Sequence, residues 1–253
     1  SDTNYYIARQ TQWLFRPAVA VTLAPNVELS LALAVQQSVT DTTRGHFVSD
    51  SQPYGYGNGG RFGEAGVQLA LHLDTRDEKR HARSGNVVDL TASYVAAAGD
   101  VTHPFETIDG RVAHYLTFPL PLHPFLGLRV GGKKVFGDAP IQDAAYVGGD
   151  GSIRTRYPQS LGGDASLYGT AELRIPVVKF TLLLPANAGL LATQDVGRVW
   201  VKGESPGGWH SAFGGGFWVG VNNLTADIRV MRAEDGKPVV IAFRLGRTLG
   251  PWQ

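Results

Sequence analysis

Val67-Gln68-Leu69-Ala70-Leu71-His72-Leu73-Asp74 alternates aliphatic residues with small or polar ones, and this period of two is typical of a β-strand with two differently solvated faces. The same alternation recurs along the chain and predicts eleven strands, with a twelfth around Tyr5 to Gln10. The eleven segments are residues 13–24, 27–40, 61–74, 86–96, 105–118, 125–136, 166–176, 189–201, 209–220, 225–233 and 239–249. We therefore expect an all-β protein.

The two faces of these segments differ in a way that favours a membrane barrel. One face is persistently aliphatic, and the other is rich in Gly, Ala, Ser and Thr. Twelve strands in 253 residues leave about 21 residues for each strand and its connection, enough for the ~9 to 11 residues that cross a bilayer as a tilted strand. We predict a transmembrane antiparallel β-barrel of about 12 strands. A soluble ligand-binding β-barrel or sandwich alternates in the same way and stays open as an alternative.

The connections between the segments largely alternate between short and long. Residues 24–26, 119–124 and 221–224 are short, whereas residues 41–60 and 138–165 are long and rich in Gly, Asp and Ser. Outer-membrane barrels have brief periplasmic turns and longer outer loops, so this asymmetry supports the barrel. The pattern has exceptions: residues 75–85 and 176–188 predict fairly long connections on the short-turn side, and residues 233–238 a brief one on the long-loop side.

Composition narrows the function classes. The chain has no Cys, which excludes disulfide scaffolds, zinc-thiolate sites and iron-sulfur clusters. The 23 basic and 22 acidic residues form no basic stripe, so we predict no nucleic-acid partner. The seven histidines lack a paired metal-ligand spacing, and no nucleophile motif or phosphate loop is present, so we expect no metal, no cofactor and no enzymatic activity. The chain contains no stretch of 18 apolar residues, so we predict no membrane-spanning helix.

Three motifs occur in order along the chain. The first is Asp74-Thr75-Arg76-Asp77, followed by Gly85. The second is the pair Gly148-Gly149, followed by Ile153-Arg154 and then by Glu172-Leu173-Arg174. The third is Asp195-Val196-Gly197-Arg198-Val199-Trp200. Over roughly residues 60–250 this order resembles the BamA/TamA (bacterial surface antigen) superfamily of outer-membrane barrels. In that family the first motif is a periplasmic turn, and the Gly pair precedes an outer loop folded into the barrel lumen.

The resemblance implies a role for Arg154. The family's loop carries a Val-Arg-Gly-Phe/Tyr tip, on which Ile153 and Arg154 match the first two positions, while Thr155 and Arg156 replace the glycine and the aromatic residue. The family's partners for this arginine, on the next two strands, map onto Glu172 and Asp195. An arginine held by carboxylates is a natural way to pin a Gly-rich loop in a polar cavity. We hypothesise this lock; the alternative is a solvated loop arginine.

The last predicted strand resembles the C-terminal recognition strand of outer-membrane proteins in Phe243-Arg244-Leu245-Gly246. In the family the first and last strands pair loosely, and Gly246 would weaken that pairing; the alternative is a simple bend. The family more often has sixteen strands, so the visible twelve could be part of a 16-stranded barrel. We expect residues 1–253 to be one outer-membrane barrel domain, the C-terminal part of a longer protein.

The resemblance implies a non-enzymatic protein of the bacterial outer membrane that works in protein assembly or translocation. Its implied partners are the lipid bilayer and either client outer-membrane proteins or a fused passenger domain. An alternative from the same resemblance is a membrane anchor or secretion conduit for an N-terminal phosphoesterase-like or patatin-like domain.

Overall fold

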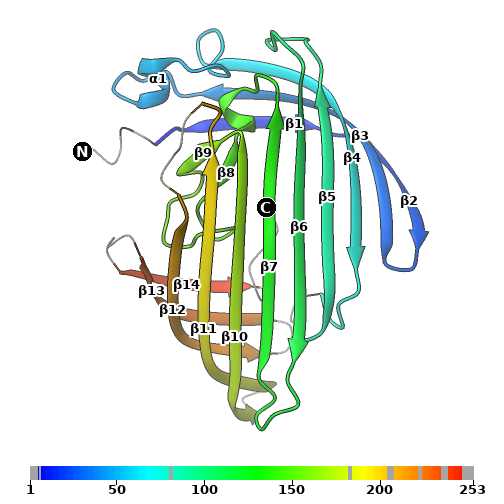
Figure 1. The fold of residues 1–253 in the computed structure, drawn as a ribbon, viewed down its shortest axis with the longest axis vertical. Helices are drawn as coiled ribbons and strands as arrows, with labels where there is room; N and C mark the ends of the chain where they lie inside the picture. Colours follow the sequence, from blue (N-terminus) through cyan, green and yellow to red (C-terminus); the bar gives the residue numbers. More distant parts are fainter. Residues whose placement is uncertain are drawn as a thin grey trace. The chain divides into compact units, whose positions relative to one another are not determined.

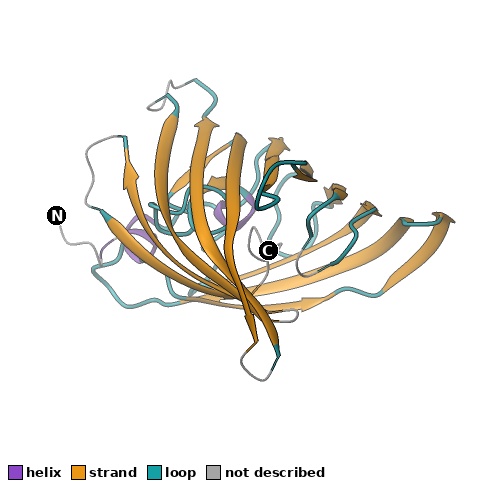
Figure 2. Ribbon diagram, turned by 90° about the horizontal axis from the view of Figure 1, so that it is seen from below, coloured by secondary structure: helices purple, strands orange, loops and turns teal. Residues whose placement is uncertain are grey.

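The computed structural model describes residues 5, 7–79, 82–181, 184–203, 208–221, 224–234 and 239–246. Figure 2 shows that almost all of this chain is strand joined by loops. The described residues include one short α-helix, α1 (Phe47–Ser51), and a 3-10 turn, η2 (Ile141–Asp143). No described helix has both the length and the apolar character that a bilayer span needs. The prediction of an all-β protein is confirmed.

The main sheet contains twelve strands. They are β1 (Gln10–Phe15), β2 (Ala18–Ala24), β3 (Val27–Thr40), β4 (Arg61–Asp74), β5 (Gly85–Val95), β6 (Phe105–Thr117), β7 (Phe125–Phe136), β10 (Ala165–Thr181), β11 (Pro185–Trp200), β12 (His210–Val221), β13 (Leu224–Ala233) and β14 (Val240–Gly246). Their order is β1-β3-β4-β5-β6-β7-β10-β11-β12-β13-β14, and β2 also pairs with β3 (Figure 1). A separate small sheet pairs β8 (Ala145–Val147) with β9 (Leu161–Gly163).

The chain forms two compact units. The first contains Ser1–His72, Leu90–Asp109 and Lys134–Ala144, and the second contains Leu73–Asp89, Gly110–Lys133 and Ala145–Gln253. Phe62, Val101 and Phe105 are buried together in the first unit. The buried charged residues described below belong to the second.

The aliphatic face of the strands points outward. Leu31, Leu33 and Ile241 are 59%, 58% and 70% exposed, whereas Ala32 and Ser38, on the opposite face of β3, are buried. Hydrocarbon is the solvent that makes such a surface favourable, because exposing this many aliphatic side chains to water costs free energy. The predicted outward orientation is confirmed, and it is the reverse of that in a soluble β-barrel.

Two boundary predictions near the start of the chain were wrong. The segment 13–24 is divided into β1 and β2 at Arg16-Pro17, although both strands keep one register with β3: Phe15 pairs with Val35, and Ala18 with Ala32. Pro17 accepts a hydrogen bond from the Leu33 amide but has no N–H to donate, so it interrupts the ladder at an edge strand. This division supplies the twelfth strand; of the described residues among 5–10, only Gln10 lies in a strand.

A third wrong prediction is the long connection at residues 176–188. β10 continues through Pro176 to Thr181, and β11 already begins at Pro185. The register shifts between Pro176 and Val178, and this irregularity lets the proline lie within a strand. The other predicted boundaries agree with the structure within one residue, except for the start of β1 and for residues 247–249, which lie outside the described residues.

Candidate functional site

The loop between β8 and β9 carries Arg154 on a tightly hydrogen-bonded turn. Gly148 and Gly149 have φ angles of +135° and +81°, which L side chains rarely adopt. The Gly148 amide donates to Ser152 Oγ at 2.6 Å, and the Gly149 amide donates to the carbonyl oxygens of Ile153 and Arg156 at 3.1 and 3.0 Å. The Gly pair therefore turns the chain so that Ile153 and Arg154 form its tip.

Apolar contacts dock this tip on the inner face of the sheet. Val147 and Ile153 are buried in a cluster with Val199, Ala212 and Met231, which lie on β11, β12 and β13. Gly197 on β11 allows the close approach, because a Cβ at Gly197 would lie 3.0 Å from Val147 Cγ1 and 3.1 Å from Ile153 Cδ1. A larger residue at position 197 would hold the loop away from the sheet.

Arg154 lies between two carboxylates. Its Nη1 donates to Glu172 Oε2 at 3.1 Å, and its Nη2 donates to Asp195 Oδ1 at 2.9 Å. The Arg154 amide also donates to Asp195 Oδ2 at 3.1 Å, so Asp195 holds both the side chain and the backbone of the tip. On the far side of the loop Arg129 Nη2 donates to the Asp150 carbonyl oxygen at 3.2 Å.

Glu172 accepts hydrogen bonds from three further arginines. Arg174 Nε donates to Glu172 Oε1 at 2.8 Å, Arg229 Nη1 to Oε2 at 2.9 Å, and Arg244 Nη2 to Oε1 at 3.3 Å. The same three arginines also contact Asp227. We use the name ionic cluster for these seven residues: Arg154, Glu172, Arg174, Asp195, Asp227, Arg229 and Arg244. The three carboxylates and three of the four arginines are buried, with Glu172 only 1% exposed, whereas the Arg244 side chain is 14% exposed.

The strand register explains how residues so far apart in the sheet meet. Arg174 on β10, Leu191 on β11, Gly216 on β12 and Arg229 on β13 form one row across the sheet. Because Gly216 has no side chain, the inner face of β12 leaves space between β10 and β13 at this row. Arg229 on β13 can therefore reach Glu172 on β10. Breaking such a buried pair costs about 3 to 5 kcal/mol, since it leaves a charge without its partner.

The sequence motif anticipated three members of the cluster and missed its extent. The structure brings Arg154, Glu172 and Asp195 together. It adds Arg174, Asp227, Arg229 and Arg244, which the motif search did not assign to a site. Asp227 and Arg229 lie two residues apart on β13 and therefore on the same face of the strand. Two charged residues on the otherwise small, polar face of a predicted membrane strand were the signal that could have identified them.

The predicted Asp74-Thr75-Arg76-Asp77 motif forms a structured turn of its own. Arg76 Nε and Nη2 donate to Asp74 Oδ1 and Oδ2 at 2.9 and 2.8 Å, an arginine fork on one carboxylate. Asp77 Oδ1 accepts the backbone N–H groups of Glu78, Arg83 and Ser84. Gly85 has a φ angle of +100° where the turn re-enters the sheet.

The pKa of Asp77 is lowered from its ordinary value of 3.8: burial opposes ionisation, but the three backbone donors outweigh it. The stabilisation of the turn is therefore complete above pH 3.8 and is lost as the pH falls through the lower pKa of the folded state. We expect Asp77→Asn to speed trypsin cleavage after Lys79 at pH 7 several-fold, because the amide is a weaker acceptor for these donors. The cleavage rate, measured by mass spectrometry, checks this.

Asp50→Asn, in the short helix α1, is the control for loss of a carboxylate. A second check uses unfolding rather than cleavage: the difference in stability between the wild type and Asp77→Asn should shrink below pH 3.8. A difference that persists unchanged at low pH would contradict the assignment.

The predicted residues of the last strand lie apart from the cluster. Phe243 is 73% exposed on the outer face. Gly246 pairs with Thr225 and has a φ angle of +145°, a conformation that favours glycine. Arg244, between them in sequence, points to the inner face and belongs to the ionic cluster.

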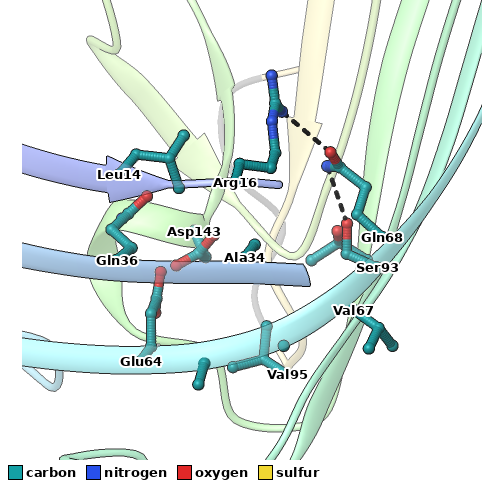
Figure 3. Close-up of a pocket in the computed structure, with 13 residues that line it drawn as sticks. Leu14, Arg16, Ala34, Gln36, Glu64, Val67, Gln68, Ser93, Val95 and Asp143 are labelled. Atoms are coloured by element: carbon teal, nitrogen blue, oxygen red, sulfur yellow. Dashed lines mark hydrogen bonds between the residues drawn. The ribbon is translucent and has the colours of Figure 1, made fainter. Parts of the chain in front are cut away.

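The first unit contains a polar cavity of about 170 Å³ at the interruption between β1 and β2. Figure 3 shows Arg16 and Gln68 joined across it, with Gln68 reaching Ser93. Arg16 Nη1 donates to Gln68 Oε1 at 3.0 Å, and Gln68 Nε2 donates to Ser93 Oγ at 3.4 Å. This path ties the edge strand, where proline removes a ladder bond, to β4 and β5. Among the described residues no three His, Asp or Glu side chains are grouped to hold a metal ion.

Comparison with known proteins agrees with this architecture. Residues 1–227 match the model of the Omp85 superfamily domain. BamA from Haemophilus ducreyi lacking POTRA domains 1-3 superposes with a TM-score of 0.71 at 13% identity, over 94% of this chain and 54% of that one. CdiB from Acinetobacter baumannii superposes with a TM-score of 0.63 at 17% identity, over 95% and 42%.

No curated protein matches significantly. The chain spans about half the length of the solved structures it resembles. At these identities the superpositions establish the fold alone, an antiparallel sheet like that of an outer-membrane barrel. The family match covers most of the chain, and the predicted resemblance is confirmed: this chain belongs to the Omp85 superfamily.

Proposed function

We propose that residues 1–253 form the outer-membrane barrel domain of a longer protein that assembles or translocates other proteins, and that the domain acts without covalent chemistry. Its family and its outward aliphatic face support the bilayer as its environment. In the part of the chain that the structure describes, the charges of the ionic cluster are arginines and carboxylates bound to one another. Such a cluster holds positions and transfers no group.

We further propose that Arg154 locks the 148–160 loop to the inner face of the barrel. The observation that carries this proposal is the double contact of the Arg154 guanidinium with Glu172 and Asp195, with its side chain 4% exposed. The tip lies 18 residues before Glu172 and 41 before Asp195, so the contact closes the loop onto two different strands.

Arg154→Ala should leave the barrel inserted and release the loop. We expect broad-specificity proteolysis of the 138–165 segment to accelerate by about tenfold or more, because a local opening that gains about 1.4 kcal/mol is populated tenfold more. The measurement is limited digestion of the refolded protein with proteinase K, with the cut sites read by mass spectrometry.

Arg156→Ala is the matched control, since it removes the same charge from the same loop but its Nη2 faces His210 Nδ1 at 2.9 Å. Arg154→Lys keeps the charge and loses the planar fork, so we expect an intermediate rate. Unchanged cleavage of Arg154→Ala, with Glu172→Ala equally resistant, would refute the lock.

The anchor alternative makes the same structural demands on the barrel. It is distinguished by the domain that the full-length protein carries beside it: a catalytic domain whose secretion or membrane attachment fails without residues 1–253 would favour an anchor, and defective insertion of other outer-membrane proteins would favour assembly.

A further inference from the structure

We propose that Arg198, Trp200 and Trp209 form a binding site for the phosphate of an anionic lipid headgroup on the outer face of the sheet. All three residues belong to the second unit. The proposal rests on the bilayer environment proposed above. It involves neither the Arg154 lock nor the closure of the sheet into a barrel.

Arg198 lies on the side of β11 that faces lipid. It pairs with Leu167 of β10 in an unbroken stretch of register, and Leu167 is 40% exposed on the outer face. Gly197 and Val199, its neighbours in sequence, face the 148–160 loop on the inner side. A charge on the lipid face costs most at the bilayer midplane and little near the interface. Arg198 is two residues before the end of β11, which favours a position near the interface.

Two tryptophans lie beside this arginine. The Arg198 guanidinium carbon is 5.1 Å from the Trp200 ring centroid, a cation–π contact. Gly197 pairs with His210, so Trp209, the residue before His210, is next to Arg198 on the neighbouring strand. The Trp200 and Trp209 rings meet edge to face, with centroids 6.1 Å apart at 85°, and both are partly exposed. Tryptophan is enriched at the level of lipid headgroups, so the pair supports this depth for Arg198.

The Arg198 guanidinium differs from the arginines of the ionic cluster in its partners. Those arginines are bound to carboxylates, whereas Arg198 Nε is buried without a hydrogen-bond acceptor in the part of the chain that the structure describes. Asp164, just before β10, already accepts the Lys202 amide at 2.5 Å, and Glu234, just after β13, accepts Ser211 Oγ. A headgroup phosphate is an anion present at this depth, and guanidinium pairs with phosphate by short, bidentate hydrogen bonds.

The test compares two lipids that differ in headgroup charge. The refolded chain in detergent micelles is titrated with equal amounts of phosphatidylglycerol and phosphatidylcholine that carry the same acyl chains. Native mass spectrometry then gives the ratio of the two lipids bound to the protein. Because the acyl chains are identical, this ratio measures the preference for the anionic headgroup. The different gel mobility of unheated and boiled samples verifies the fold of each variant.

We expect the wild type to prefer phosphatidylglycerol and Arg198→Ala to lower this preference about fivefold, the effect of losing one basic residue at an anionic surface. Arg198→Lys keeps the charge but loses the planar fork and its stacking on the indole, so its preference should be intermediate. Trp200→Leu should also lower the preference, because the cation–π contact no longer orients the guanidinium.

Arg232→Ala is the matched control, since it removes the same charge from the outer face. Arg232 is exposed on β13 and pairs with Phe213, which pairs in turn with Gln194 of β11. Arg232 is therefore level with Gln194, four residues or about 13 Å along the strand from Arg198. Its loss should leave the preference within about twofold of the wild type.

A folded wild type that binds both lipids equally would overturn the site, and so would a full preference in both Arg198→Ala and Trp200→Leu. A loss in Arg232→Ala as large as that in Arg198→Ala would assign the preference to surface charge in general. Should Arg198→Ala fail to fold, Arg198→Lys and Trp200→Leu carry the same test. A wild type that stays in solution without detergent and binds neither lipid would instead refute the bilayer environment on which the site rests.

Discussion

Glu172→Ala is expected to destabilise the barrel more than any other single removal of charge, by about 3 to 5 kcal/mol, because a buried carboxylate is lost while its cations stay buried. Glu172 contacts Arg154, Arg174, Arg229 and Arg244. Without Glu172, only Arg154, from the loop, would keep Asp195 as a carboxylate partner. The other three would converge on Asp227 alone. The measurement is equilibrium unfolding by denaturant in detergent micelles.

Two variants sharpen this result. Glu28→Ala removes an exposed carboxylate from β3 and should change stability by less than about 0.5 kcal/mol, as surface substitutions do. The double variant Glu172→Ala with Arg154→Ala should be less destabilised than the sum of the single variants, because the second change removes a cation that the first left unpaired. An unfolding midpoint for Glu172→Ala equal to that of the wild type would contradict the role of this carboxylate.

Gly216→Ala is expected to cost about 3 kcal/mol, at the upper end of what overpacking costs, or to prevent assembly of the C-terminal hairpins. A Cβ at Gly216 would collide with the carbonyl oxygen of Ile228 on β13, which is backbone and cannot rotate away. It would also lie 2.7 Å from the Cα of Arg229, so Arg229 would be pushed away from Glu172. The fraction of heat-modifiable, inserted protein measures the effect.

Gly169→Ala is the matched control for a glycine within a strand. A Cβ there would lie 3.6 Å from its nearest neighbours, the Arg129 carbonyl oxygen and Val196 Cγ1, which is ordinary van der Waals contact. We expect this variant to insert like the wild type. If Gly216→Ala inserts equally well, the space left by the missing side chain on β12 is not needed to bring Arg229 to Glu172.

The wrong boundaries share a physical cause. Proline within a periodic segment indicates an end in most strands, yet Pro176 lies inside β10 because the register shifts beside it, and Pro17 divides β1 from β2 without changing their register. Whether a proline ends a strand depends on whether a partner needs its N–H, and the partner is set by the sheet. Alternation within a single segment does not contain that information.

The sequence by itself determined the strand periodicity and the face of each strand that meets hydrocarbon, because these depend on residue type and on local spacing. The three motif positions Arg154, Glu172 and Asp195 were implied by the resemblance to a known family. Only the tertiary structure decided that Arg244, 72 residues after Glu172, shares its carboxylate, and that Phe125 meets Trp218. These contacts depend on register and on sheet curvature, which bring together side chains from strands that are not neighbours. A charged residue on the inner face of a strand indicates that a partner is needed, but the fold determines which residue that partner is.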